Sequence, residues 1–281
     1  MEITLHTDVP EFVRYARPFY EADPVAHTGA LTALANVERT GKWAVLVTVR
    51  DRGELCGVMI GDGDRPAGVS GLPVAAAAPV AAALSDAGVE LTAVSGPREP
   101  AEAFGDAWSR VTGGPVRQVS QQWLYVLDSL AEPRRPRGEF RVATAADIPR
   151  IARWRVDFTT ELEPVVTPDE DSAEVVRVAM AQGGVHGLWC VDGNPVSMAL
   201  GRAPEGGVSR ISFVYSPPGQ RGHGYASAVT AAVTRQVLDN GVRNVVLHAD
   251  ANNPVANAIY QRLGFLTRHQ VLRLAFPVAK K

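Results

Sequence analysis

The feature that most constrains the fold is a glycine-rich turn between an expected strand and an expected helix. The strand covers Val208–Tyr215, and the turn that follows reads Ser-Pro-Pro-Gly-Gln-Arg-Gly-His-Gly. The helix should run from Gly224 to Asn240, because apolar residues recur there at steps of three or four and form one stripe that faces a sheet. That stripe is made by Ala226, Val229, Val233 and Val237. A strand, a tight turn and a covered helix are typical of an α/β fold.

One seam divides the chain, at Leu130–Gly138, where two prolines and three arginines interrupt an otherwise apolar pattern. After the seam, hydrophobic periodicity predicts a strand, two helices, three strands, a helix, a strand, a short helix and a final strand. In order these are Phe140–Ala143, a helix from Ala145, Asp171–Gln182, His186–Val191, Val196–Arg202, Val208–Tyr215, Gly224–Asn240, Asn244–Ala249, a helix from Pro254, and Arg268–Phe276.

The first half shows a similar order of elements. It reads as a strand Ile3–His6, helical stretches to about Arg39, strands Trp43–Val49, Leu55–Gly61 and Ala67–Leu72, a helix at about Val74–Ala87, a strand Val89–Val94, a helix from Pro100, and strands after Arg117. We therefore predict two copies of one α/β (α+β) unit, each a mixed, mostly antiparallel sheet flanked by helices. The predicted boundaries are 1–130, a linker 131–138, and 139–281.

The glycine-rich turn has the features of an anion site. Gly222 and Gly224 leave the turn without side chains, so backbone N–H groups can approach a ligand closely. The start of the helix adds unpaired N–H groups and the positive end of the helix dipole. A structural turn with incidental glycines is the plain alternative. A P-loop would end in Gly-Lys-Ser/Thr, and a dinucleotide fingerprint would need a third glycine and a later acidic residue.

A second segment, Asn253–Phe265, reads as a short helix after the next strand. Asn253 is a good N-cap, Pro254 suits the first helical position, and Gly264 suits the C-terminal end. Asn253, Asn257 and Tyr260 are four and three residues apart, so they share one helix face. Taken alone, the segment could be no more than a capped amphipathic helix with a half-buried tyrosine.

Together the two segments resemble the GNAT N-acetyltransferase superfamily. Its signature R-x-x-G-x-G/A is matched by Arg221, Gly224 and Ala226, and N-x-x-x-x-x-x-Y-x-x-x-G-F follows about 30 residues later. The resemblance covers Phe140–Phe276, and VYSPP…RGHGYASAV with NPVANAIY is similar to the branch that includes glycine N-acyltransferases. We do not transfer the glycine substrate on this basis.

The resemblance implies an N-acetyltransferase in which acetyl-CoA donates an acetyl group to a primary amine by direct attack. The turn would hold the CoA pyrophosphate, and a backbone N–H near Val214 or Tyr215 would bind the thioester carbonyl. The implied cofactor-binding residues are Val214, Tyr215, Arg221, Gly222, His223, Gly224, Tyr225, Ala226, Asn253 and Asn257.

Acyl transfer to an amine needs a neutral amine and a protonated leaving thiolate. The resemblance assigns the general acid to Tyr260. For the base, Glu161 and Glu163 compete with Asp250 and His248 and with a chain of water molecules. The acidic residues could equally be solvated loop or strand-end residues. We expect Cys190 to be a buried structural thiol, because it lies on an earlier strand.

The first half lacks the same signatures. Gly71–Ala77 stands where the glycine turn should be, but it contains Pro73 and bulky residues, and the later helix Glu102–Arg110 has no Asn…Tyr pair. We expect no cofactor site there and one site per chain. A catalytically silent acyl-CoA-binding module, acting as a sensor or scaffold, is the alternative to an enzyme; the presence of Tyr260 favours the enzyme.

Composition limits the partners. A net charge of −2 gives no pull towards nucleic acid or an anionic membrane, and no apolar run approaches the ~20 residues that span a bilayer. Two cysteines and no visible signal peptide indicate a cytoplasmic protein, and six scattered histidines predict no metal site. Arginine-dominated basic residues suggest a GC-rich bacterial genome. We expect acetyl-CoA and a small-molecule or amino-group acceptor as partners, and a monomer or homodimer.

Overall fold

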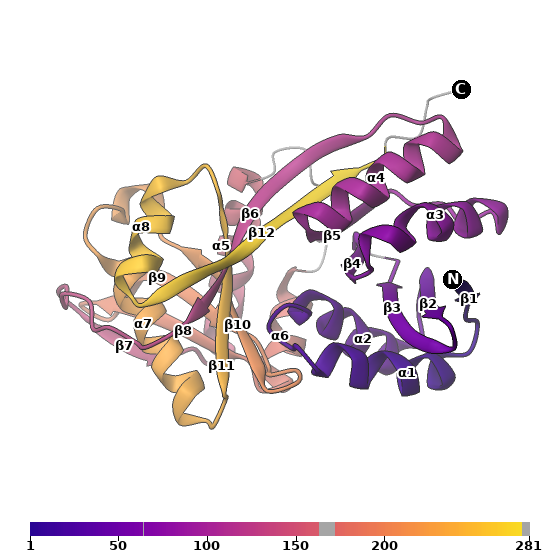
Figure 1. Cartoon of the computed structure of the whole chain (residues 1–281). Coiled ribbons are helices and arrows are strands. Elements are labelled where there is room, and N and C mark those ends of the chain that lie inside the picture. Colours follow the sequence, from indigo (N-terminus) through magenta and orange to yellow (C-terminus); the bar gives the residue numbers. More distant parts are fainter. Residues whose placement is uncertain (64, 163–171, 277–281) are drawn as a thin grey trace. The chain divides into compact units, whose positions relative to one another are not determined.

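The same ten elements, in the order β-α-α-β-β-β-α-β-α-β, occur in each half of the chain (Figure 1). The computed structural model describes all residues except 64, 163–171 and 277–281. The first half contains β1 (Glu2–Leu5), α1 (Val9–Glu21), α2 (Thr28–Thr40), β2 (Val45–Asp51), β3 (Glu54–Gly61), β4 (Ala67–Gly71), α3 (Ala77–Asp86), β5 (Ala93–Pro97), α4 (Arg98–Thr112) and β6 (Arg117–Leu127).

The second half contains β7 (Glu139–Val142), α5 (Ile148–Leu162), α6 (Ser172–Ala181), β8 (Val185–Val191), β9 (Asn194–Gly201), β10 (Val208–Tyr215), α7 (Tyr225–Asp239), β11 (Asn244–Asp250), α8 (Pro254–Arg262) and β12 (Phe265–Ala275). Most strand pairs are antiparallel, and the β4–β5 and β10–β11 pairs are parallel. The predicted fold class is confirmed.

The structure divides into two compact units whose boundaries differ from a division of the chain at residues 131–138. Unit 1 contains Met1–Leu124, Asp250–Asn252 and the C-terminal stretch from Arg268, and unit 2 contains Tyr125–Ala249 and Asn253–Thr267. The later part of β12 thus belongs with the first half, where it pairs antiparallel with β5 from Val271↔Pro97 to Ala275↔Ala93. Its alternate residues pack into the core of unit 1, and this burial is the physical reason for the difference. Those residues are Leu272 and Leu274, and Phe276, which directly follows the strand, packs in the same cluster.

Unit 1 has a three-layer arrangement. One apolar cluster joins α1 and α2 to β2 and β3, through residues such as Phe12, Leu34 and Ile60. A second cluster joins α3 and α4 to the other side of the same strands, since successive strand residues point to opposite faces. The strand predicted at Val89–Val94 instead begins at Ala93, because its pairing with β12 starts at Ala93 and its pairing with β4 starts at Val94.

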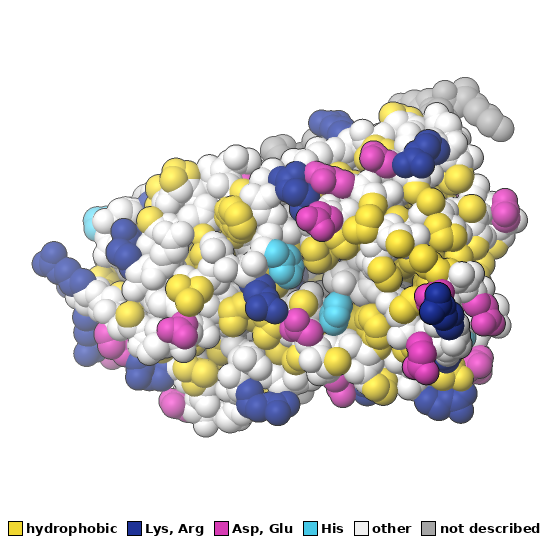
Figure 2. Space-filling model, in the orientation of Figure 1, with side chains coloured by type: hydrophobic (Ala, Val, Ile, Leu, Met, Phe, Trp, Pro, Cys, Tyr) yellow, Lys and Arg dark blue, Asp and Glu magenta, His cyan; other side chains and the backbone are white. Residues whose placement is uncertain are grey.

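Unit 2 repeats the arrangement. Helix α7 packs against β8 and β9, and its Val233 and Val237 lie directly over Gly187 and Gly201, where a Cβ would come within 2.2 and 2.6 Å of them. On the other face, α5 and α6 form a cluster with residues of β8, β9 and β10. The face of the chain seen in Figure 2 carries basic and acidic side chains interspersed.

Strand β10 is irregular near its end. Its pairing with β9 shifts register between Ser212 and Tyr215, and Phe213 has a φ of 50°, which is rare for a bulky residue. Its parallel pairing with β11 runs from Val208↔Asn244 to Ile211↔Leu247, although both strands continue beyond these residues. After Ile211 the strand therefore lacks the register with β11, and its pairing with β9 is irregular between Ser212 and Tyr215.

In the part of the chain that the structure describes, no helix combines the length and the apolar character needed to cross a bilayer.

Candidate functional site

The glycine turn forms an open cradle at the start of α7. After a short 3₁₀ turn at Pro218–Gln220, Gly222 and Gly224 both adopt a φ of 81°. Gly224 is the N-cap of α7 and supplies no side-chain hydrogen bond. A Cβ at Gly222 would meet nothing within 4 Å, and one at Gly224 would meet only Pro136 at 4.0 Å. The first N–H groups of α7 are thus left accessible, as an anion site requires.

Arg221 links this turn to the end of α5. Its Nη2 lies 2.7 and 2.9 Å from the two carboxylate oxygens of Glu161, and its Nε donates to the Ser216 carbonyl at 3.0 Å. The Tyr215 hydroxyl donates to the same Glu161 carboxylate at 3.3 Å. Glu161, which the sequence offers as a base, is therefore engaged with two other predicted site residues. The ion pair is half exposed, so its stabilisation is small.

Two serines fix the junction between β10 and the turn. The Ser197 hydroxyl donates to the Tyr215 carbonyl at 3.0 Å, and the Ser216 hydroxyl donates to the Ser197 hydroxyl at 2.8 Å. All three residues are buried, so these hydrogen bonds hold the backbone where β10 ends. Val214 lies between this junction and the irregular residue Phe213.

The two asparagines of α8 have structural partners. Asn253 is the N-cap, and its Oδ1 accepts from the Ala256 N–H at 3.0 Å. Asn257 Oδ1 accepts from the Tyr125 hydroxyl at 3.0 Å. The predicted caps of this helix are confirmed, since Gly264 follows its end with a φ of 91°. The amide nitrogen of Asn253 is a group that could face a ligand.

Tyr260 is almost fully buried between two aromatic rings. Its ring centroid lies 6.2 Å from that of Tyr125 and 6.3 Å from that of Phe265. Burial, with a smaller contribution from Tyr125, raises the pKa of Tyr260 to about 12. Among the described residues no hydrogen-bond partner of its hydroxyl is found. The phenol is thus protonated at neutral pH and its hydrogen is available for donation.

The other predicted residues are distributed as follows. The rings of His223 and Tyr225 lie beside each other at the turn in a tilted arrangement, with centroids 5.4 Å apart, and Ala226 lies in the first turn of α7. Asp250 is the last residue of β11 and belongs to unit 1. Its carboxylate accepts a hydrogen bond from the Asn252 N–H at 2.9 Å. His248 lies two residues earlier on the same strand. Glu163 lies outside the described residues. Cys190 is a buried free thiol, as predicted.

Sequence reasoning missed three features of unit 2. The Tyr125–Asn257 hydrogen bond joins residues 132 positions apart, and the positive φ of Phe213 has no signature in its residue type. Arg155 and His186 are buried polar residues on elements whose neighbours are apolar. A polar residue on the core side of a periodic apolar stripe is the signal that could have pointed to Arg155.

No group of three or more His, Cys, Asp or Glu side chains that could hold a metal ion occurs among the described residues. Residues 148–265 match the family model described as "Acetyltransferase (GNAT) family". These residues contain the glycine turn, Glu161 and Tyr260.

Solved structures and curated relatives extend this likeness. A tandem GNAT protein from the clavulanic acid biosynthesis pathway superposes with a TM-score of 0.60 over 100% of this chain and 99% of that one, at 14% identity. The chain thus has the fold of a tandem GNAT protein.

A mycothiol acetyltransferase of Catenulispora acidiphila is 34% identical over 64 residues, which are 23% of this chain and 20% of that protein. One from a Nocardioides species is 29% identical over 129 residues, which are 44% of each protein. The matches therefore span less than half the length of these relatives.

Proposed function

We propose that unit 2 transfers an acetyl group from acetyl-CoA to a primary amine by direct attack. The observation that carries the proposal is the open turn at Gly222–Gly224. It joins an irregular strand end to an uncapped helix N-terminus, within the segment that matches the family model. The mycothiol acetyltransferases are named for an acetyl transfer, which fits this reaction class. The proposal includes the similarity to the glycine N-acyltransferase branch, but it does not include glycine as the acceptor.

The turn fits the diphosphate of coenzyme A. Two glycines with positive φ leave space where side chains would stand, and the N–H groups at the start of α7 favour negative charge there. Arg221 stands beside the turn and can bind a phosphate by exchanging its contact with Glu161. Acetyl-CoA would supply the activated thioester at the irregular end of β10.

The residues around that position can then perform two tasks. Backbone N–H groups at Val214 and Tyr215 can bind the developing oxyanion, because the register with β11 ends at Ile211 and the register with β9 shifts between Ser212 and Tyr215. Tyr260 can protonate the leaving thiolate, because its raised pKa keeps the phenol protonated and its hydroxyl is not already donating. Asn257 and Tyr125 hold α8 in place beside it.

The attacking amine must also lose a proton to a base. Glu161 is paired with Arg221 in this structure, so it can accept a proton from the amine only after that ion pair opens. Asp250 and a chain of water molecules are the competing routes. The same ion pair favours the second candidate function, a silent acyl-CoA-binding module, because a silent module needs no free base.

Calorimetry and turnover together test the proposal. Titration with acetyl-CoA should give about one site per chain, and release of free CoA should accelerate when primary amines are added. Binding without amine-dependent release of CoA from any amine would favour the silent module. Absence of binding, or two comparable sites per chain, would overturn the assignment to unit 2.

A further inference from the structure

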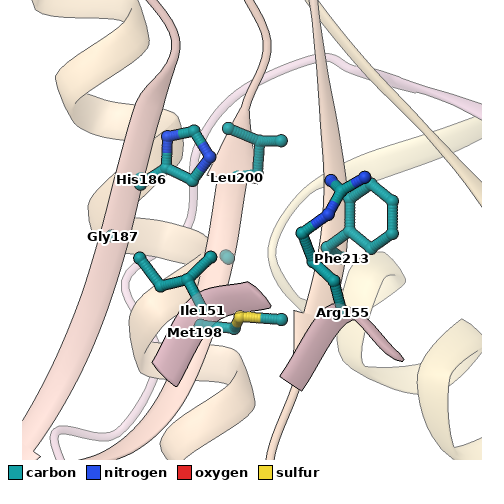
Figure 3. Close-up of a pocket in the computed structure, with 8 residues that line it drawn as sticks. Ile151, Arg155, His186, Gly187, Met198, Leu200 and Phe213 are labelled. Atoms are coloured by element: carbon teal, nitrogen blue, oxygen red, sulfur yellow. The ribbon is translucent and has the colours of Figure 1, made fainter. Parts of the chain in front are cut away.

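The end of β10, where the thioester would lie, is packed firmly onto α5. The ring centroid of Phe213, the residue before Val214, lies 5.4 Å from that of Phe158 and 3.9 Å from the guanidinium carbon of Arg155. Both partners come from α5, and Figure 3 shows the guanidinium alongside the Phe213 ring. These contacts fix one side of the proposed reaction centre, because a movement of the strand would break them.

The helix that carries Tyr260 has fewer contacts of this kind. α8 has nine residues, and Tyr260 is the only one of them that is buried. Val255, in its first turn, is 69% exposed. Helices shorter than about 12 residues are marginal in water unless tertiary contacts stabilise them. The position of the Tyr260 hydroxyl therefore depends on the contacts that α8 makes with other segments.

Residues 125–131 make several of these contacts, and we call them the α8 clamp. They contain the end of β6 and the residues that follow it. The Asp128 N–H donates to the Gly264 carbonyl at 3.0 Å, and the Ala131 N–H donates to the Leu263 carbonyl at 3.1 Å. The last carbonyl groups of a helix have no partner within the helix. These hydrogen bonds therefore hold the C-terminal end of α8.

Gly264 allows the clamp to approach the helix closely. A Cβ at Gly264 would overlap the Ser129 carbonyl oxygen, and the φ of Gly264 is 91°. A side chain there would strain the backbone and push the clamp away from α8. The glycine at the end of this helix is thus explained by its contact with the clamp as well as by its capping conformation.

Tyr125 is the side chain through which the clamp reaches Tyr260. It is 1% exposed, and its hydroxyl donates to Asn257 Oδ1 at 3.0 Å. Asn257 lies three residues before Tyr260 on the same side of α8. The rings of Tyr125 and Tyr260 also lie beside each other, with centroids 6.2 Å apart. Burial raises the pKa of Tyr125, and a hydrogen bond with the Gln261 side chain partly offsets this, so the phenol keeps its proton at neutral pH.

We propose that Tyr125 is a positioning residue for Tyr260, and that its hydrogen bond to Asn257 holds α8 where the Tyr260 hydroxyl meets the leaving sulfur. The inference rests on the proposed function of unit 2, in which Tyr260 gives its proton to the thiolate. A misplacement of about 1 Å in such a site can cost about 100-fold in rate. Tyr125 itself transfers no proton. Because Tyr125 lies on β6, the last element of the first half of the chain, that half contributes to catalysis by unit 2.

Tyr125→Phe tests the proposal, because it keeps the ring and removes only the hydrogen bond to Asn257. We expect kcat to fall by about 10- to 100-fold, since Tyr260 would be held less well. The dissociation constant for acetyl-CoA should stay within about twofold of the wild type. Release of CoA with the primary amine that reacts fastest gives kcat, and calorimetry gives the dissociation constant. An unchanged kcat, or a loss confined to acetyl-CoA binding, would overturn the proposal.

Ser209→Ala is the matched control. Ser209 is fully buried in unit 2, and its hydroxyl donates to the Arg202 carbonyl at 2.6 Å, so this variant also loses one hydrogen bond of a hydroxyl group. Urea unfolding should show a similar loss of stability in the two variants. The kcat of Ser209→Ala should equal that of the wild type. An equal fall of kcat in both variants would attribute the effect to stability and would contradict a positioning role.

A double-mutant cycle with Tyr260→Phe identifies the residue through which Tyr125 acts. In the Tyr260→Phe background, Tyr125→Phe should lower kcat by less than about twofold, because the hydroxyl that it positions is already absent. A further loss as large as in the wild type would mean that Tyr125 acts independently of Tyr260, and the proposal would be wrong.

The outcomes separate the two proposals. If the wild type binds no acetyl-CoA or shows no amine-dependent release of CoA, the proposed function fails and the role of Tyr125 fails with it. If the wild type is active and Tyr260→Phe lowers kcat while Tyr125→Phe does not, the proposed function stands and the role of Tyr125 is wrong.

Discussion

The two units carry the same order of elements. The turns after their fourth strands, β4 and β10, nevertheless differ in exposure, in backbone φ and in the space around the Cβ positions. In unit 2, Gly222 and Gly224 are exposed, have positive φ and have almost nothing near the Cβ position. In unit 1, Gly71 is buried, and a Cβ there would lie 2.7 Å from the Val58 carbonyl and 2.8 Å from the Tyr20 ring. Pro73 and a 3₁₀ turn at Val74–Ala76 then lead into α3.

The helices that follow the fifth strand differ in the same way. Relative to its N-cap Asn253, α8 has Asn257 and Tyr260, four and seven residues on. In α4 the N-cap is Pro97, and the corresponding positions are Ala101 and Phe104, both fully buried. Phe104 packs against Trp108 and Phe276.

The comparison shows what separates a site from its scaffold. Backbone order and helix placement are common to both units, so the fold alone does not make a cofactor site. In unit 1, apolar side chains occupy the turn after the fourth strand and the helix after the fifth strand. In unit 2, the same places have an open turn and polar side chains. Reciprocal substitutions can therefore test which difference matters for function.

The largest effect should follow from making unit 2 resemble unit 1 at Tyr260. We expect Tyr260→Phe to lower kcat by roughly 10- to 10⁴-fold, because general acid assistance contributes about 10²–10⁴-fold and a thiolate needs less of it than an alkoxide. The dissociation constant for acetyl-CoA should barely change, since the ring remains. Steady-state kinetics and calorimetry provide the measurements.

Tyr20→Phe in unit 1 is the matched control, because it removes a hydroxyl from a buried tyrosine outside the proposed site. Its kcat should equal that of the wild type. An unchanged kcat in Tyr260→Phe would mean that another group protonates the thiolate, and a collapse of binding would make Tyr260 a cofactor contact.

Next in size is the effect of closing the open turn. We expect Gly224→Val to weaken acetyl-CoA binding by about 100-fold or more, because a β-branched side chain would stand where the phosphates approach. Its φ of 81° also makes valine strained there, so stability must be measured in parallel. Gly88→Val provides the comparison, since Gly88 has a φ of 69° and open space in unit 1. Equal loss of affinity in both variants would attribute the effect to strain alone.

The third substitution makes unit 1 resemble unit 2. Phe104→Tyr should destabilise the protein by roughly 1–3 kcal/mol, because a hydroxyl would enter a fully buried aromatic cluster without a partner. It should create no second acetyl-CoA site, since the turn at Gly71 stays closed. Urea unfolding gives the stability, and calorimetry gives the number of sites. A second site in this variant would contradict the view that the turn is required.

The parts of this comparison that sequence could predict are local. Hydrophobic periodicity gave the element order, and the caps Asn253 and Gly264 follow from residue type, because capping depends on a few adjacent residues. The site residues of the glycine turn and α8 follow from spacing and resemblance, and they stay predictions until tested.

The remaining features depend on contacts between distant residues. The pairing of β12 with β5, the hydrogen bond from Tyr125 to Asn257 and the Arg221–Glu161 ion pair each join segments tens of residues apart or more. Nothing in the local pattern chooses one partner over another for such contacts. Arg155 was missed because a charged residue on a helix is usually exposed, although its position in the apolar stripe of α5 was a signal of its burial.

The smallest expected effect is on stability, and it concerns one aspartate near the start of each unit. Asp147 in unit 2 is buried, its carboxylate pairs with Arg141 at 2.7 Å, and it accepts from the Thr144 N–H at 2.8 Å. These contacts, the Arg141 hydrogen bonds above all, lower the pKa of Asp147 to about 2. Asp8 in unit 1 is exposed and only caps α1, through the Glu11 N–H.

We expect Asp147→Asn to cost about 1–2 kcal/mol at pH 7, less than the full pKa shift implies, because Arg141 is partly exposed to solvent. Since the folded pKa lies below the unfolded value of about 3.9, this stabilisation is complete above roughly pH 5 and is lost as the pH falls towards about 2. Asp8→Asn should change stability by less than about 0.5 kcal/mol, because asparagine caps helices equally well. Urea unfolding of the three proteins at pH 7 and at pH 3 measures the difference. If the gap between wild type and Asp147→Asn did not narrow at the lower pH, the Arg141 pair would not be the source of the stabilisation.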